Sequence, residues 1–213
     1  MDDIVKAALK KWPNVPHCYG WLALDARGNW RMRDERCQQQ HLRGDVIRHP
    51  ALIDFINRNY QVDTNGCWYF QNGPQRVYVN LESTPYVVRT ASMTNQPANS
   101  GLMFHTGEAL TQINHFYVDQ AGNFMLVGDG RLAQIDDRDL AHCLRNVRLN
   151  GATASEEILF DAIYAPSDNQ DAAQSLELTL HIDAGQYLTA PLQRQELITL
   201  MQEYGYQANP HAV

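Results

Sequence analysis

Cysteine and histidine side chains are the groups of this sequence best suited to nucleophilic or metal chemistry, with four cysteines and eight histidines in 213 residues. Two pairs are adjacent, His17-Cys18 and His142-Cys143. Neighbours on a strand or helix point in different directions, so a catalytic pair would have to meet through space and carry a lowered thiol pKa. Buried structural cysteine is the commoner outcome. An enzyme with a Cys/His site is therefore the alternative interpretation, with no catalytic residue assigned.

Metal and nucleotide motifs are the next kind of chemistry to consider. Cys37 and His41 have the spacing of two ligands on one helical face, but a structural zinc site needs two such pairs. The sequence has no CxxC, HExxH or Gly-x-Ser-x-Gly motif, and no glycine-rich phosphate loop or dinucleotide fingerprint. We expect neither a metal nor a cofactor. Under the alternative interpretation, the enzyme with a Cys/His site could also be a metal-dependent one.

Arginines are concentrated near the N-terminus of a chain whose net charge is -7. Residues 1–48 hold nine Lys/Arg and six Asp/Glu, whereas residues 149–213 hold one base and nine acids. Either the two ends face each other, or the basic end meets an anionic partner. Aromatic and arginine side chains are the usual anchors of recognition surfaces. We predict the following ligand-binding residues: Trp21, Trp30, Arg31, Arg33, Arg36, Arg43 and Arg48.

The alternation of Trp30 and Met32 with Arg31 and Arg33 predicts a strand with one apolar and one basic face. A plainer interpretation also stands, in which the aromatic side chains fill the core and the arginines are solvated. On the first interpretation the protein is a non-enzymatic binding or regulatory module for a small anionic ligand or an acidic protein partner.

Other partners are less compatible with the composition. An acidic chain is a poor nucleic-acid binder, because neutralisation of phosphates dominates that affinity. No apolar run approaches the roughly 18 residues of a membrane span. The N-terminal residues lack the basic flank and apolar stretch of a signal peptide. We expect a cytoplasmic protein with no nucleic-acid or membrane partner; the sequence does not specify an oligomeric state.

A pattern of Asp-x-x-Gly-x-aromatic occurs at 25–30, 63–68 and 119–124, and returns one residue shorter at 183–187. Aspartate can cap a tight turn with its side chain, and glycine supplies the positive φ that the turn needs. A calcium loop needs several oxygen ligands at alternate positions and a distal glutamate, whereas each copy offers one aspartate. We interpret the four copies as hairpin turns.

Four helices accompany these hairpins. The apolar spacing predicts one at 3–11; Pro50 starts a second, Asp136 or Asp137 caps a third, and Pro191 starts a fourth that ends at Gly205. In the fourth, Leu197, Ile198, Leu200, Met201 and Tyr204 are expected to point inward. The segment 153–163 is also predicted as helix.

Alternating apolar residues at 77–81 and 176–182 indicate half-buried strands of antiparallel sheets. We therefore predict an α+β fold of mainly antiparallel sheets built from repeated hairpin and helix units. The uncharged, turn-rich segment 92–101 is the expected linker between two subdomains, 1–91 and 102–213. A second polar loop is expected at 165–174.

Two long motifs carry a family resemblance, WPNVPHCYGWLALDARGNWRMRDE at 12–35 and GCWYFQNGPQRVYVNLE at 66–82. They resemble a conserved hypothetical family of proteobacteria, which implies a bacterial, cytoplasmic protein with no assigned activity. The order of 47–55 followed by 77–88 is similar to a second bacterial family of unknown function, in which α+β motifs repeat and a signalling or ligand-sensing role has been suggested.

Overall fold

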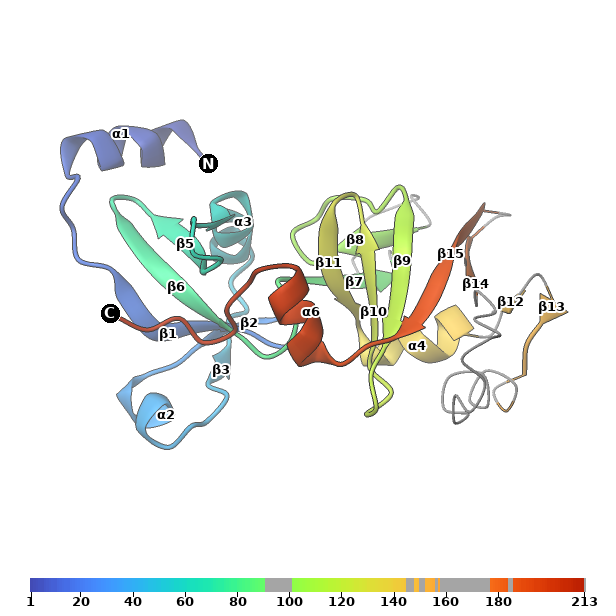
Figure 1. Cartoon of the computed structure of the whole chain (residues 1–213). Coiled ribbons are helices and arrows are strands. Elements are labelled where there is room, and N and C mark those ends of the chain that lie inside the picture. Colours follow the sequence, from blue (N-terminus) through green and yellow to red (C-terminus); the bar gives the residue numbers. More distant parts are fainter. Residues whose placement is uncertain are drawn as a thin grey trace. The chain divides into compact units, whose positions relative to one another are not determined.

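The computed structural model describes residues 1–90, 101–144, 148–149, 152–155, 157, 177–183 and 186–212. Contacts within the chain divide it into two compact units (Figure 1). Unit 1 comprises Met1–Pro85 and Leu200–Val213, and unit 2 comprises Tyr86–Thr199. The chain thus leaves unit 1 after its sixth strand, forms all of unit 2, and returns to complete unit 1.

Unit 1 is built on a six-stranded sheet with the order β3-β2-β1-β6-β5-β4. Its centre is the parallel pair β1 and β6, and every other neighbouring pair is antiparallel. The strands are β1 (Cys18–Leu24), β2 (Trp30–Met32), β3 (Asp45–Val46), β4 (Tyr60–Val62), β5 (Trp68–Asn72) and β6 (Gln75–Leu81).

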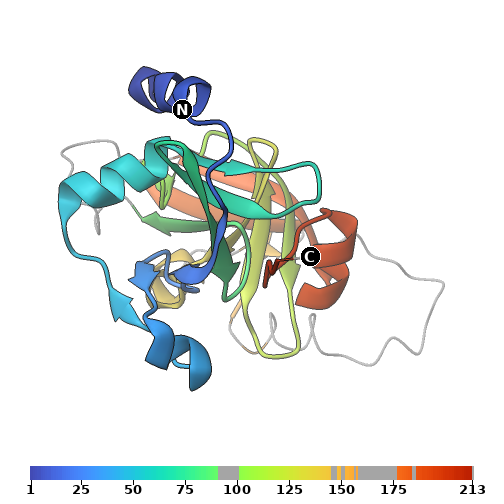
Figure 2. The ribbon, with the colours of Figure 1, turned by 90° about the vertical axis from the view of Figure 1, so that its left-hand side faces the viewer.

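Helices surround this sheet, and three of them contribute buried apolar side chains, Val5, Ile56 and Leu200. The helices are α1 (Asp3–Lys11), α2 (Glu35–Gln39), α3 (Pro50–Arg58) and the end of α6 (Leu197–Glu203). Phe55 of α3 packs edge-on against Phe70 of β5, with ring centroids 5.3 Å apart. Both views place α1 and α2 on opposite sides of the unit (Figures 1 and 2). The buried residues include Leu22, Leu24, Trp30, Ile56, Val79, Leu81 and Leu200.

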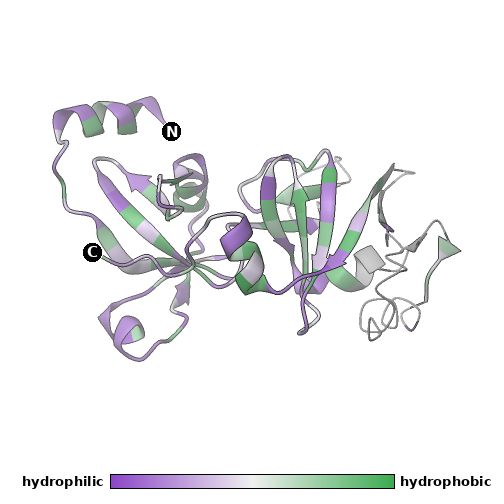
Figure 3. Ribbon diagram, viewed as in Figure 1, coloured by the Kyte–Doolittle hydropathy of each residue, from purple (hydrophilic) through white to green (hydrophobic). Residues whose placement is uncertain are grey.

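Unit 2 is built on a nine-stranded sheet with the order β13-β12-β14-β15-β9-β10-β11-β7-β8. Its strands are β7 (Tyr86–Thr90), β8 (Leu102–Phe104), β9 (Ile113–Val118), β10 (Phe124–Gly128), β11 (Arg131–Ile135), β12 (Arg148–Leu149), β13 (Ala152–Thr153), β14 (Glu177–Asp183) and β15 (Gln186–Arg194), with the helix α4 (Asp137–Leu144) after β11. Figure 3 shows hydrophobic residues interspersed with hydrophilic ones along the central strands of this sheet, whose core includes Phe104, Phe116, Leu126 and Ile135.

The predicted α+β fold of mainly antiparallel sheets is confirmed. All four predicted hairpins are antiparallel strand pairs: β1–β2, β4–β5, β9–β10 and β14–β15. Three pairs of the two sheets are parallel, β1–β6, β7–β11 and β9–β15. The parallel pairs join segments that are distant in sequence, which no local pattern predicts.

The predicted helices agree with the structure except at the C-terminal one. Helix 3–11 and the starts at Pro50 and Asp137 are confirmed, and Gly205 ends α6 with a φ of +62°. The start at Pro191 is wrong, because Pro191 lies inside β15 where pairing passes from β14 to β9. A strand tolerates proline where no ladder bond needs its missing N–H. Ile198 is 61% exposed, so its predicted inward orientation is also wrong.

Several predicted segments lie outside the described residues. They are the linker 92–101 apart from Gly101, the loop 165–174, and most of the helix expected at 153–163, although Thr153 belongs to β13.

The two units also divide the chain differently from the predicted halves. Strand β7 pairs with β11 and β8 and so belongs to unit 2, while the residues from Leu200 onward belong to unit 1. Among the described helices, none combines the length and the apolar composition that a bilayer crossing requires.

Candidate functional site

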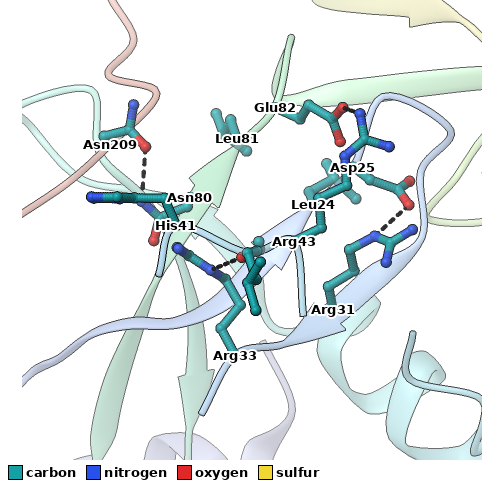
Figure 4. Close-up of a pocket in the computed structure, with 12 residues that line it drawn as sticks. Leu24, Asp25, Arg31, Arg33, His41, Arg43, Asn80, Leu81, Glu82 and Asn209 are labelled. Atoms are coloured by element: carbon teal, nitrogen blue, oxygen red, sulfur yellow. Dashed lines mark hydrogen bonds and ion pairs between the residues drawn. The ribbon is translucent and has the colours of Figure 1, made fainter. Parts of the chain in front are cut away.

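A pocket of about 210 Å³ lies in unit 1 where β1, β2, the loop after α2, the end of β6 and the C-terminal segment meet (Figure 4). Its polar lining comes from five separate parts of the chain. In the close-up, Asn209, Asn80 and His41 lie on one side, and Glu82, Asp25 and Arg31 on the other. The lining residues are Ala23, Leu24, Asp25, Arg31, Arg33, His41, Leu42, Arg43, Asn80, Leu81, Glu82 and Asn209.

Arg31 is fixed in the pocket wall by a buried carboxylate. Its Nε atom lies 2.7 Å from Oδ2 of Asp25, and its Nη1 atom donates to the carbonyl of Gly44 at 2.9 Å. Burial raises the pKa of Asp25, but hydrogen bonds from Asn29 and the Arg31 guanidinium outweigh it and lower that pKa below its usual value. Asp25 is therefore ionised at neutral pH, and Arg31 is held as a structural cation.

The other two arginines of the pocket differ in their partners. Arg43 forms an ion pair with Glu82, with 2.7 Å between Nη2 and Oε1. Arg33 donates from Nε to the carbonyl of Leu42 at 3.2 Å and has no carboxylate partner among the described residues. Its outer guanidinium nitrogens are available to an anion, and a guanidinium binds oxyanions through two parallel hydrogen bonds.

The loop that carries His41 closes α2 in an unusual way. Asp34 caps the start of α2 by accepting from the Cys37 amide, and the helix ends with the Leu42 amide donating to the Cys37 carbonyl and the His41 amide to the Gln38 carbonyl. That bond pattern normally places glycine at the position of His41, because the residue there adopts positive φ. His41 has a φ of +52°, so a side chain occupies a place where glycine is less strained.

Gly44 sets the distance between this loop and β2. A Cβ atom at Gly44, whose φ is +80°, would lie 2.2 Å from the carbonyl oxygen of Met32. Only glycine allows the loop to approach so closely, which brings Leu42 to Arg33 and the Gly44 carbonyl to Arg31. Figure 3 shows α2 and this loop as mostly hydrophilic, as expected of a segment that serves a polar site.

The C-terminal segment supplies the last wall of the pocket. Leu81 donates its amide to the carbonyl of Ala208 at 2.8 Å, and the Asn80 side chain donates to Oδ1 of Asn209 at 2.9 Å. The Oδ1 atom of Asn80 is buried and has no hydrogen-bond partner among the described residues. The two amides therefore keep unused hydrogen-bonding capacity at the pocket wall.

The structure gathers three of the seven predicted ligand-binding residues at this pocket, Arg31, Arg33 and Arg43. Trp30 is 2% exposed, packs edge-on against Tyr60 and donates from Nε1 to Asn57, so its side chain belongs to the core. The remaining predicted residues, Trp21, Arg36 and Arg48, are exposed and lie outside the pocket lining.

Sequence reasoning missed five polar residues of the pocket. The sequence pattern identifies Asp25 only as a turn residue and does not reveal its contact with Arg31. The positive φ of His41 carries no local signal in the sequence. Asn80, Glu82 and Asn209 meet through long-range pairing, so neither spacing nor composition predicts their proximity.

None of the three cysteines whose side chains the structure describes has the activated thiol that the alternative interpretation requires. Burial raises the pKa of Cys18 and Cys67, and the hydrogen bond to Asp34 raises that of Cys37. A catalytic thiol needs the opposite shift. The predicted helical face of Cys37 and His41 is wrong, because α2 ends at Gln39. No group of three or more metal-ligating side chains occurs within the described ranges.

A family model with the description "Protein of unknown function (DUF2946)" matches residues 1–211, so the chain belongs to this family. The expected membership of a family without assigned function is thus confirmed. No curated protein matches the chain.

Two solved structures are distantly similar to this chain. A DUF1285 family protein from Silicibacter pomeroyi DSS-3 is 14% identical, with 73% of this chain and 93% of that chain covered and a TM-score of 0.41. A DUF1285 family protein from Shewanella baltica OS155 is 12% identical, with 57% and 88% covered and a TM-score of 0.37.

Proposed function

We propose that unit 1 of this DUF2946 family member is a non-enzymatic binding module for a small anionic ligand, which it holds in the pocket between β2, the loop after α2 and the C-terminal segment. The observation that carries the proposal is Arg33. It is a guanidinium in the lining of a pocket, without a carboxylate partner among the described residues, in a chain of net charge -7.

The charge balance of the lining favours an anion. Two arginines are matched by carboxylates, Arg31 by Asp25 and Arg43 by Glu82. Arg33 is then the cation in excess among the Lys/Arg and Asp/Glu residues of the lining. The largely buried Asp25–Arg31 pair also keeps the Arg31 guanidinium oriented, so less side-chain entropy is lost when an anion binds.

The size of the pocket favours a small ligand over a protein partner. Its volume of about 210 Å³ is below the roughly 300–1,000 Å³ of sites for drug-sized molecules. An acidic protein partner would instead use a broad exposed surface, and the exposed predicted residues Arg36 and Arg48 lie outside the pocket. The ligand is accordingly expected to be an oxyanion with few other atoms.

Isothermal titration calorimetry with inorganic phosphate, pyrophosphate, sulfate and citrate tests the proposal. We expect at least one of these anions to bind, and Arg33→Gln to weaken that binding about 10- to 100-fold, as for the loss of hydrogen bonds to a charged group. Arg33→Glu places a repelling carboxylate at the same position and should abolish binding.

Arg36→Gln is the matched control, since Arg36 is an exposed arginine three residues away that does not line the pocket. It removes the same net charge and should leave the affinity unchanged. Equal losses for Arg33→Gln and Arg36→Gln would show that net charge alone attracts the anion. No binding of any of the four anions at millimolar concentration would refute the proposal.

A further inference from the structure

The C-terminal segment is attached to unit 1 by a small number of hydrogen bonds. The Gln207 amide donates to the carbonyl of Gly66 at 3.0 Å, and the Gln207 side chain donates to the carbonyl of Asn65 at 3.0 Å. The Leu81 amide donates to the carbonyl of Ala208 at 2.8 Å. These bonds place Asn209 at the pocket, beside the end of β6 (Figure 4).

Asn209 holds its place there through one side-chain contact, in which its Oδ1 atom accepts from Asn80. The Nδ2 group of Asn209 donates to no other described residue, and the residue is exposed. An amide N–H group in a pocket lining, on the opposite side from Asp25 and Glu82, is a ready donor to an oxyanion.

The donors of the pocket are spread over several directions, which selects among anions. The guanidinium of Arg33, the imidazole of His41 and the amide of Asn209 come from three different segments. A planar carboxylate presents its acceptor lone pairs in one plane. A phosphate group presents oxygens in tetrahedral directions and can satisfy all three donors together.

The position of Asn209 in the chain gives ligand binding a mechanical consequence. The chain passes into unit 2 shortly after Glu82, at the end of β6, and returns to unit 1 at Leu200, before Asn209. The end of α6 and the buried Tyr206 lie between Leu200 and Asn209 and anchor the returning chain in unit 1. A ligand that bridges the loop after α2 and Asn209 would therefore tie the C-terminal segment beyond Tyr206 to the pocket.

We infer that the ligand of this pocket is a phosphate group bound jointly by Arg33, His41 and the side-chain amide of Asn209, and that its binding fixes the C-terminal segment on β6. This inference rests on the proposed anion site. Phosphate occupancy and attachment of the C-terminal segment then favour each other, because the phosphate is held more weakly once the segment has left β6.

Amide hydrogen exchange of the full chain tests the coupling, with inorganic phosphate as the probe at ten times its Kd. The amide of Leu81 opens when the segment leaves β6. If the open state binds phosphate about 10-fold more weakly, as expected without Asn209, the exchange should slow about 5-fold, by the factor (1 + [L]/Kd)/(1 + [L]/10Kd). The amide of Leu126, in the core of unit 2, should not respond to the same degree.

Asn209→Ala removes the proposed donor and should weaken phosphate binding about 10-fold and abolish the slowing at Leu81. The control is His211→Ala in the same segment, since His211 is exposed and forms a hydrogen bond with the backbone carbonyl of Asn209 rather than with its side-chain amide. It should change neither quantity. If phosphate binds the wild type but Asn209→Ala binds it equally and exchange at Leu81 is unaltered, the inference is overturned while the anion site stands. If Arg33-dependent binding of phosphate is absent, the proposed site itself fails.

Discussion

Replacement of His41 by glycine should make the protein more stable and its anion binding weaker. His41 occupies the C-terminal capping position of α2 with a φ of +52°. A left-handed conformation costs an L-residue roughly 1–2 kcal/mol, which glycine avoids. Glycine in turn gains roughly 0.4–1 kcal/mol more conformational freedom in the unfolded chain. The difference predicts a stabilisation of about 0.5–1 kcal/mol for His41→Gly.

Binding should change in the opposite direction. His41→Gly removes the imidazole from the pocket lining, and loss of one hydrogen bond to a charged ligand typically weakens binding by about 10-fold. Backbone strain that persists at a ligand site is expected where the side chain is used there. His41→Asn is the matched control, because asparagine tolerates the left-handed region and keeps a side-chain donor.

Urea unfolding followed by tryptophan fluorescence measures the first quantity for unit 1 alone, because all four tryptophans lie in that unit. Calorimetry with phosphate measures the second. A His41→Gly variant that is less stable than the wild type would refute the assignment of the strain. A variant that is more stable but binds phosphate with unchanged affinity would show that the strained His41 serves no purpose in the pocket.

Three further predictions concern the framework of unit 1. Gly66→Ala should lower the free energy of unfolding by about 2–4 kcal/mol, because its Cβ atom would lie 1.9 Å from the carbonyl oxygen of Gly205. Gly73 also has positive φ, but the nearest neighbour of an added Cβ atom is 4.0 Å away, so the control Gly73→Ala should lower the free energy of unfolding by only about 1 kcal/mol. Equal losses for the two variants in urea unfolding would contradict the close approach at Gly66. Burial raises the pKa of Tyr78 to about 12. The neutral phenol therefore adds at most about 2.7 kcal/mol to the free energy of unfolding, which is fully present below pH 10 and is lost as the pH rises towards 12. In alkaline unfolding experiments, the Tyr78→Phe variant should lack this loss of stability. The pKa of Asp25 is lowered in the folded state, so its carboxylate stabilises the fold above pH 3.8, and this stabilisation is lost as the pH falls through the lowered pKa. The loss of stability caused by Asp25→Asn should therefore be greatest at pH 7 and become smaller in acid. A stability difference between Asp25→Asn and the wild type that does not depend on pH would refute this prediction.

Short sequence patterns predict the helices and strands of this fold well where the residues of the pattern can play only one structural role. The Asp and Gly residues of the hairpin pattern cap and turn the chain, and the structure shows that chemistry directly: the first oxygen of Asp25 accepts from the amides of Arg27 and Asn29, and Asp119 repeats the arrangement. Where a residue can play two structural roles, the sequence pattern does not predict the element correctly. Pro191 fits both a helix start and a strand crossover, and pairing with two neighbouring strands decides between them.

The site could be predicted only in part, for a related reason. The alternation in β2 correctly separated Trp30 from Arg31, but it does not say which face is covered, and Trp30 proved to be in the core. Arg33 directly follows β2, whereas Arg36 lies in α2 and Arg48 follows β3, and the sequence does not show that only the first of these places lines the pocket. Asn209 lies 129 residues from Asn80, so no window of sequence contains both.

The hairpin turns at Asp25, Asp63 and Asp119 share one architecture, yet the first of them is adapted to the pocket through the second oxygen of its aspartate. In the second copy that oxygen of Asp63 accepts from the hydroxyl of Tyr78, and in the third copy that of Asp119 accepts from the side chain of Asn123. In the first copy it binds Arg31, which then reaches the carbonyl of Gly44 and supports the loop of His41. A structural turn motif thereby positions a cation and a loop at once, which explains why the pocket forms beside the first copy.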